Sequence, residues 1–293
     1  MFEKPALQPD PSTPSEQASA ATAPPTVLTI AGYDPSAGAG VLADLKTFAA
    51  HGVYGMACVT ALTVQSSQGV RRVQGVDPGI VTETLDCLAE DVRFSAIKVG
   101  MLGNGAVAVA VANWLDRTTG VPVILDPVLK SSSGMDLIDA AGWSLLRSRL
   151  LARVDWITPN VDELAALTDA PRPANRTEME DLGHKLMEMA AHQGNLELKM
   201  VITGGDNAET ADDLLVSSEI CRWYAGEHIQ TNSTHGTGCA FSSALAARIA
   251  LGDDAAFAVQ AAKDYVADAL QHAYPIGRGV GPLDHSLGSL GRN

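Results

Sequence analysis

Short apolar runs alternate with helical patterns along most of this chain. The run 26–31 (TVLTIA) has the β-branched residues of a buried strand, and apolar residues then recur at helical spacing over 41–49. Further strands are expected at 57–62, 96–99, 122–125, 155–158 and 199–203, and further helices at 80–89, 106–117, 137–149, 161–167, 178–191, 239–251 and 255–272. This alternation predicts an α/β fold with an open, mostly parallel central sheet that helices cover on both faces. Runs at 214–216 and 222–224 indicate a small, more exposed antiparallel addition.

Ligands of such sheets bind beyond the carboxyl ends of the parallel strands. Polar or glycine-rich residues follow most of the expected strands, and packing alone does not explain so many of them. These candidate site segments are 32–40, Gln65, 99–101, 126–128, 158–160 with Glu163, and 203–206.

The segment Thr234-His235-Gly236-Thr237-Gly238-Cys239 stands directly before an apolar helical run. Its glycines allow a tight turn, and the start of the helix offers unpaired N–H groups and a positive dipole end to an anion. A thiol at a helix start is expected to have a lowered pKa. The segment therefore predicts an anion site beside a candidate base, which points to phosphoryl transfer.

Composition limits the possible partners and compartment. The net charge of −14 over 293 residues disfavours nucleic acid, because phosphate contacts need clustered Lys and Arg. The four cysteines are widely spaced with no C-x-x-C pair, which is typical of free thiols in a reducing compartment and predicts a cytoplasmic protein. No apolar run is long enough to span a membrane.

The ends of the chain differ from its middle. Residues 1–25 are rich in Pro, Ala, Ser and Thr, and they contain neither an apolar signal segment nor an Arg. They are predicted to be a disordered tail. One folded domain is expected at 26–285, followed by a short C-terminal tail at 286–293.

Seven stretches carry a resemblance to a known family. In chain order they are TIAGYDPSAGAG (29–40), ADLKTF (43–48), TALTVQ (60–65), KVGML (98–102), LDPV (125–128), ITPNVDE (157–163) and THGTGC (234–239). They resemble the ribokinase-like superfamily and, within it, the bacterial hydroxymethylpyrimidine/phosphomethylpyrimidine kinases of thiamine biosynthesis. The resemblance covers about residues 28–284. It implies a three-layer α/β/α kinase domain that uses ATP and Mg²⁺ to phosphorylate 4-amino-5-hydroxymethyl-2-methylpyrimidine and then its monophosphate.

The resemblance assigns the acceptor pocket to residues near the first strands. Asp44 and Gln65 match the acid and amide that hold the aminopyrimidine ring, and both side chains can form paired hydrogen bonds with it. Asp44 lies at the border of an apolar helix face, so it is expected to lean toward a cleft. Gly32 would let the ring approach the backbone, while Met101 and Val128 match positions that pack on it.

The nucleotide and metal residues follow from the same resemblance. Asn160 and Glu163 have an N-x-x-E spacing that the family uses around magnesium and phosphates, although the same spacing forms an ordinary capping box. Asp126 resembles the acid near the metal or the phosphates. Thr203 and Gly205 are expected beside the nucleotide.

The anion loop completes the implied site. Gly236, Thr237 and Gly238 would cradle the transferring phosphoryl group. Cys239 stands where many ribokinase relatives have an Asp that accepts the hydroxyl proton, so it is the candidate general base.

One residue departs from the family pattern. Members typically have a Lys directly before the Gly-Gly pair at 204–205, and this chain has Thr203. Since the monophosphate is the more anionic acceptor, the second phosphorylation is expected to suffer more. Lys98, Lys130, Arg278 or a second metal could compensate.

Other functions stay open at this point. Pyridoxal/pyridoxine kinase is the nearest, because its substrate is also a small nitrogen ring with a hydroxymethyl group. A non-catalytic pyrimidine-binding protein on the same fold is a second alternative. A dinucleotide oxidoreductase is disfavoured, since the loop after the first strand has no clean G-x-G-x-x-G. The resemblance further implies a homodimer, with the strands after Asp213 as a candidate interface.

Overall fold

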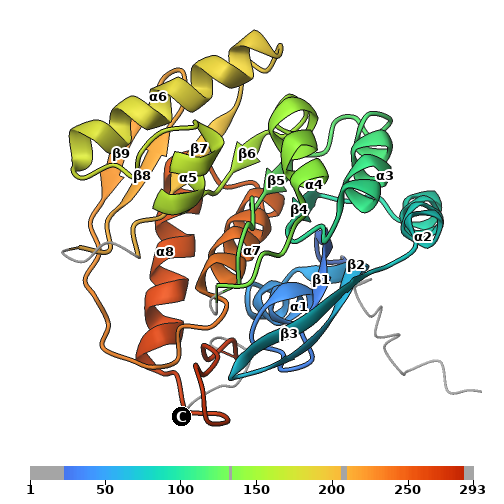
Figure 1. Cartoon of the computed structure of the whole chain (residues 1–293), viewed down its shortest axis with the longest axis horizontal. Coiled ribbons are helices and arrows are strands. Elements are labelled where there is room, and N and C mark those ends of the chain that lie inside the picture. Colours follow the sequence, from blue (N-terminus) through green and yellow to red (C-terminus); the bar gives the residue numbers. More distant parts are fainter. Residues whose placement is uncertain (1–22, 132–133, 206–209, 287–293) are drawn as a thin grey trace, which may run out of the picture.

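The computed structural model describes residues 23–131, 134–205 and 210–286, and in them nine strands form one sheet (Figure 1). The strand order is β3-β2-β1-β4-β5-β6-β7-β8-β9, and the neighbours from β2 to β7 are parallel. β3 at one edge, and β8 and β9 at the other, are antiparallel. The strands are β1 (Thr26–Tyr33), β2 (Tyr54–Ser66), β3 (Gly69–Gly75), β4 (Ala96–Val99), β5 (Val123–Leu125), β6 (Trp156–Ile157), β7 (Lys199–Ile202), β8 (Asp213–Val216) and β9 (Cys221–Tyr224).

Helices cover both faces of the sheet and form separate cores with it. On one face, α1 (Gly40–Ala50), α7 (Thr237–Ala250) and α8 (Ala255–Gln271) pack on alternate strand residues such as Val27 and Ile124. On the other face, Leu28 and Leu125 pack on the remaining helices. These are α2 (Pro78–Asp91), α3 (Gly105–Leu115), α4 (Ala140–Leu145), η1 (Leu146–Leu150), α5 (Val161–Leu167) and α6 (Arg176–His192). The predicted three-layer α/β/α architecture is confirmed.

Several helices begin at the residues that the sequence pattern favours. Asp77 caps α2 by accepting hydrogen bonds from the N–H groups of Gly79 and Ile80, with Pro78 as the first helical residue. Asp254 caps α8 in the same way, by accepting a hydrogen bond from the Phe257 N–H at 2.9 Å. The starts of these two helices are thus determined locally, because an aspartate carboxylate accepts hydrogen bonds from the first N–H groups of each helix.

Three details differ from the expectations. The sequence pattern does not predict strand β3, because its residues are mostly polar or half-exposed and lack a buried apolar run. The helix expected at 137–149 begins only after its Asp139 cap and ends in a π-helical turn, η1. The addition at 214–216 is antiparallel as predicted but fully buried, because β9 covers it as the edge strand.

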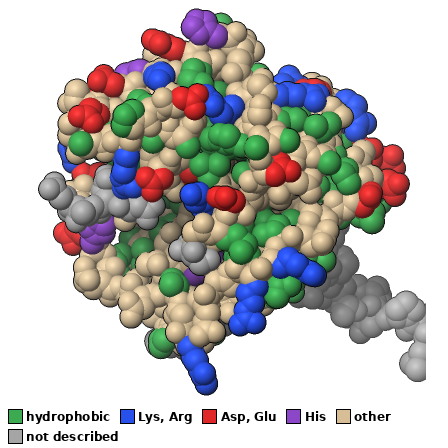
Figure 2. Space-filling view, in the orientation of Figure 1, with side chains coloured by type: hydrophobic (Ala, Val, Ile, Leu, Met, Phe, Trp, Pro, Cys, Tyr) green, Lys and Arg blue, Asp and Glu red, His purple; other side chains and the backbone are tan. Residues whose placement is uncertain are grey.

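The strand order also determines where a ligand site can form. From β1 the chain moves to β2 on one side, and it later returns to β4 on the other side of β1. This reversal is a topological switch point, and the carboxyl ends of β1, β4 and β5 meet beside it. Figure 2 shows that acidic and basic side chains are scattered over the face in view.

Among the described residues, no helix combines the length and the apolar character needed to cross a membrane. The tails predicted at 1–25 and 286–293 lie almost wholly outside the described part of the chain, so the expected disorder of residues 1–25 stays a prediction.

Candidate active site

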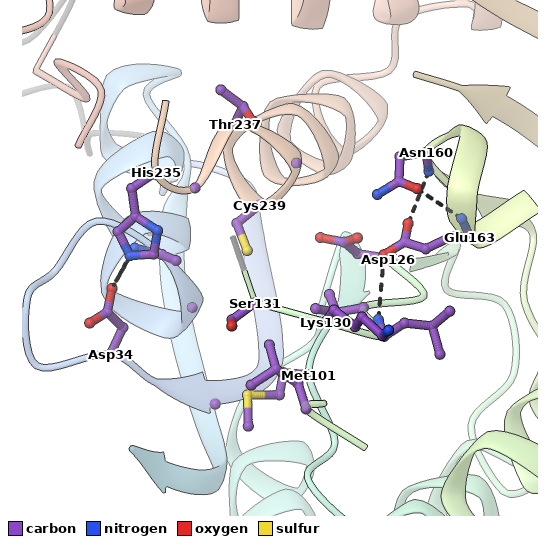
Figure 3. Close-up of a pocket in the computed structure, with 18 of the residues that line it drawn as sticks. Asp34, Met101, Asp126, Lys130, Ser131, Asn160, Glu163, His235, Thr237 and Cys239 are labelled. Carbon is purple, nitrogen blue, oxygen red and sulfur yellow. Dashed lines mark hydrogen bonds and ion pairs between the residues drawn. The ribbon is translucent and has the colours of Figure 1, made fainter. Parts of the chain in front are cut away.

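A cavity of about 850 Å³ opens at the carboxyl ends of the parallel strands, and it brings together most of the predicted site residues (Figure 3). Two predicted residues are not in its lining: Asp44, which is fully buried, and Gly205, which is exposed in the loop after β7. The predicted residues that line it are Gly32, Gln65, Met101, Asp126, Val128, Asn160, Glu163, Thr203, Gly236, Thr237, Gly238 and Cys239.

One end of the cavity is formed by the ends of β1, β2 and β4. Met101 is 9% exposed and lies against Gly32, where a Cβ would come within 2.7 Å of its Sδ atom. A glycine is therefore required for the Met101 side chain to keep this position. Gln65 and Val128 also line this region, so an apolar floor lies beside an amide group.

The opposite end contains the start of α5, where Asn160 and Glu163 form a reciprocal capping box. The Glu163 N–H donates to Asn160 Oδ1 at 2.8 Å, and the Asn160 N–H donates to Glu163 Oε2 at 2.9 Å. The Leu129 N–H also donates to Glu163 Oε1 at 3.4 Å, which ties the loop after β5 to this helix start. The capping interpretation is confirmed, and it holds both oxygen-bearing side chains in the cavity wall.

The anion loop ends at the start of α7. Gly236 is the N-terminal cap residue with φ of +88°, and no side chain caps the helix there. A Cβ on Gly236 would lie 1.9 Å from the carbonyl oxygen of Gly38, whereas one on Gly238 would meet nothing within 4 Å. No side chain therefore caps the first N–H groups of α7, which leaves them able to bind an anion in the cavity, and the predicted anion site stays a prediction.

The predicted lowering of the Cys239 pKa is wrong for the structure described. Desolvation by the surrounding protein raises the pKa of the thiol to about 12, and the carboxyl groups of Asp126 and Asp44 add to this rise. The Lys98 ammonium and a hydrogen bond from Gly40 oppose it but do not outweigh burial. The thiol is therefore protonated at neutral pH in this state.

A buried ionic network lies beneath the cavity, and it includes Asp44. The Lys98 ammonium lies 3.0 Å from both carboxylate oxygens of Asp44, and both side chains are 0% exposed. Thr29 Oγ1 and Ser243 Oγ donate to the same carboxylate at 2.6 and 2.7 Å. Asp44 thus does not lean into the cleft as expected, because these hydrogen bonds hold it under the floor.

Asp126 joins this network to the cavity. Its Oδ2 atom lies 3.8 Å from Lys98 Nζ and accepts a hydrogen bond from Ser242 Oγ at 3.0 Å. Burial raises the pKa of the Asp126 carboxyl, although Lys98 and Ser242 act against that rise. Asp126 is 5% exposed and lines the cavity, so it is the acid of the network that a ligand can reach.

Several residues that line the cavity have no role that the sequence predicts. Asp34 and His235 lie within two of the family motifs, and Asp34 Oδ2 lies 2.8 Å from His235 Nε2, a contact that the motifs alone do not predict. Arg172, in the loop before α6, lines the cavity beside Asp162, and no pattern in the sequence singles it out.

Of the residues that could compensate for the missing Lys at position 203, Lys130 lines the cavity and Lys98 is buried below it. Arg278 is outside the lining.

A divalent metal would have few protein ligands in this cavity. Within the described ranges, no group of three or more His, Cys, Asp or Glu residues could hold a metal ion by itself. Asp126 and Glu163 are nevertheless hard oxygen donors in the cavity wall, which suits a magnesium ion whose other ligands are water and phosphate.

Comparison with known proteins agrees with this architecture. A family model described as phosphomethylpyrimidine kinase matches residues 34–284. The hydroxymethylpyrimidine/phosphomethylpyrimidine kinase of Escherichia coli (strain K12) is 41% identical over 88% of this chain and 96% of its own length.

Solved structures include similar kinases of two kinds. An ADP complex of Bacillus subtilis pyridoxal kinase has a TM-score of 0.80 and 30% identity, covering 90% of this chain and 98% of that one. The phosphomethylpyrimidine kinase from Clostridium difficile 630 has a TM-score of 0.73 and 30% identity, covering 84% and 99%. The chain therefore belongs to the phosphomethylpyrimidine kinase family of phosphotransferases.

Proposed function

We propose that this protein transfers phosphoryl groups from ATP to 4-amino-5-hydroxymethyl-2-methylpyrimidine and then to its monophosphate. The observation that supports this most strongly is the order of groups along one cavity. An apolar floor with the Gln65 amide lies at one end, and the oxygen donors of Asn160 and Glu163 lie at the other. The uncapped start of α7, with Cys239, lies between them.

Each part of the chain then has a distinct task. Met101 and Val128 support the pyrimidine ring, and the Gln65 amide hydrogen-bonds its polar edge. Thr203 is proposed to face the nucleotide, and Gly205 lies in the loop that follows it. The N–H groups of Thr237 and Gly238 stabilise the charge of the transferring group, which is the main demand of this reaction.

Magnesium is the proposed metal, and Asp126 and Glu163 are the residues that would hold it directly or through water. When bound, it would neutralise phosphate charge in the transition state. The capping box and the Leu129 N–H orient Glu163, while Ser242 and Lys98 orient Asp126. This chain therefore positions both acids before any ligand arrives.

Cys239 is the proposed proton acceptor for the substrate hydroxyl, and only its thiolate can accept a proton. Since the pKa is about 12 in the structure described, the role requires that the loaded site stabilise the thiolate. A Cys239→Ala variant is expected to lose about 10²- to 10⁴-fold in kcat while nucleotide binding persists.

Pyridoxal is a second candidate acceptor, favoured by the TM-score of 0.80 to a pyridoxal kinase. A coupled assay of ADP formation with the pyrimidine alcohol, its monophosphate and pyridoxal separates the two. The pyrimidine function predicts the highest kcat/KM for the two pyrimidines. A higher kcat/KM for pyridoxal would replace it with the second candidate.

A further proposal, the oligomeric state, starts from the family resemblance. A homodimer is proposed, and light scattering during gel filtration would test it through the molar mass. Since β8 is buried and β9 forms the exposed edge, β9 is the part of the predicted interface that another chain could reach.

A further inference from the structure

The end of the cavity that contains the start of α5 is acidic. Asp162 and Glu163 lie in the first turn of α5, and Asp126 also lines the cavity. A polyphosphate that binds here adds several negative charges, and its repulsion from these acids must be offset by cations, of which a magnesium ion is one. Among the lining residues that the structure describes, two have a Lys or Arg side chain, Lys130 and Arg172.

The two cations belong to different parts of the cavity wall. Lys130 lies in the loop after β5, where its ammonium group is 3.9 Å from Asp136 Oδ1, and the residue after Asp136, Leu137, packs in the apolar floor. The Arg172 guanidinium instead donates a hydrogen bond from Nη1 to Asp162 Oδ1. Arg172 is therefore the cation that the fold places at the α5 end.

The wall beside Arg172 continues to the end of β7. Thr203 forms an isolated parallel bridge with Asn160, and its N–H donates to the Pro159 carbonyl at 2.9 Å. Asn160 is the cap residue of α5, and Asp162, which accepts from Arg172, is two residues further on. Thr203, Asn160 and Arg172 therefore share one side of the cavity, and it is the side proposed to face the nucleotide.

The backbone around Arg172 is restrained before any ligand binds. Pro171 and Pro173 flank it, and their rings fix φ at both neighbours, while a residue before proline is itself confined to extended conformations. Pro173 is buried, and the Ala174 N–H donates to Glu178 Oε2 at 2.8 Å, which ties the loop to the start of α6. The Arg172 side chain is 41% exposed, so the loop is fixed while the guanidinium stays accessible to a ligand.

We propose that Arg172 binds phosphate oxygens of the nucleotide. A guanidinium is charged at every pH at which the protein is folded, and its planar fork can bind two phosphate oxygens at once. Asp162 holds this group at the cavity wall until a ligand arrives, and the more highly charged phosphates then compete for its N–H donors. The inference rests on the proposed kinase function and deepens it, because it names a cation of this chain for the nucleotide site.

The test measures ADP binding by isothermal titration calorimetry, with Mg²⁺ present and no acceptor. Arg172→Met removes the charge and keeps an unbranched side chain, and it is expected to raise the Kd of ADP about tenfold. Arg172→Lys keeps the charge without the planar fork, so its Kd should lie between those of the wild type and of Arg172→Met.

Arg117→Met is the matched control. Arg117 also pairs with an exposed aspartate, since its Nη2 atom lies 3.1 Å from Asp86 Oδ1, but neither residue lines the cavity. The Kd of ADP for this variant should match that of the wild type. If Arg172→Met unfolds below the assay temperature, Arg172→Gln takes its place.

Salt separates a charge contact from a change in the shape of the loop. The Kd of ADP for the wild type should rise more steeply with NaCl than the Kd for Arg172→Met, because screening acts on a charge that the variant lacks. An unchanged Kd for Arg172→Met, or a raised Kd with the salt dependence of the wild type, would overturn the role of Arg172.

The remaining outcomes concern the source of the phosphate and the proposed function. An unchanged Kd of ADP together with a raised KM for the pyrimidine monophosphate would assign the guanidinium to the phosphate of the acceptor, and it would contradict the proposal. A wild-type protein that binds ADP but phosphorylates neither pyrimidine would refute the proposed function, while the Kd comparison would still decide the role of Arg172.

Discussion

The Lys98 ammonium lies 3.0 Å from each carboxylate oxygen of Asp44, and neither side chain is exposed to solvent. Asp44 lies on α1 and Lys98 on β4, so the pair connects an outer helix to the centre of the sheet under the cavity. Desolvation alone would lower the pKa of Lys98, but the carboxyl groups of Asp44 and Asp126 outweigh it and raise the pKa. Lys98 thus stays charged and holds two acids of the network in place.

We expect Lys98→Met to destabilise the protein by about 3–5 kcal/mol, because it leaves the buried Asp44 carboxylate without its counter-ion. Urea unfolding followed by circular dichroism measures this change. The double variant Lys98→Met with Asp44→Leu is the matched control, and it should regain part of the lost stability. A single variant as stable as the wild type would contradict this account of the network.

Gly236→Ala tests the contact between the loop that follows β1 and the loop that precedes α7. The new Cβ would meet the Gly38 carbonyl oxygen at 1.9 Å, and the residue has φ of +88°. Strain of this kind costs about 1–3 kcal/mol before any displacement of the loop. Thermal unfolding should show a clearly lower Tm. Gly238→Ala has open space around its Cβ and should unfold near the wild-type Tm. Equal Tm values for the two variants would argue against a close contact between Gly236 and the Gly38 carbonyl.

The raised pKa of Cys239 predicts how its thiol reacts. Only the thiolate is alkylated, so a pKa of about 12 makes the reaction with iodoacetamide slow at pH 7. The rate should rise about tenfold per pH unit up to the highest pH at which the fold survives. Mass spectrometry of the Cys239 peptide follows it, with the exposed Cys87 as the reference for reagent access. A plateau below pH 8 in the ligand-free protein would mean that burial does not control this thiol.

Thr203→Lys tests whether the departure from the family pattern limits the second phosphorylation. Thr203 lines the cavity, and its N–H donates to the Pro159 carbonyl, so a longer side chain can be placed there without losing a backbone bond. A cation near the phosphates should favour the more anionic acceptor, by roughly tenfold in the ratio of kcat/KM for monophosphate over alcohol. Initial rates on the two acceptors give this ratio, and an unchanged ratio would mean that Thr203 is not limiting.

The sheet and most helices could be predicted because their signals are local. Strand β4 and helix α5 have the expected bounds, since buried β-branched residues mark one and the N-x-x-E capping box marks the other. Strand β3 could not be found in this way, because an edge strand is stabilised by pairing with β2 rather than by its own apolar residues.

The residues of the site also divide into those whose position could be predicted from the sequence and those whose position could not. Residues in loops at strand ends, such as Met101 and Asn160, were placed in the cavity wall by chain order alone. The position of Asp44 could not be predicted, because it depends on Lys98, which is 54 residues away in sequence. The Cys239 pKa depends in the same way on the side chains that surround it, and not only on its helix start.

The most direct test of the proposed function is phosphorus NMR of the product formed from 4-amino-5-hydroxymethyl-2-methylpyrimidine with excess ATP and Mg²⁺. The account predicts a pyrimidine monophosphate that is then converted into the diphosphate, with ADP formed at each step. The absence of any phosphorylated pyrimidine, in a preparation that phosphorylates pyridoxal under the same conditions, would contradict it.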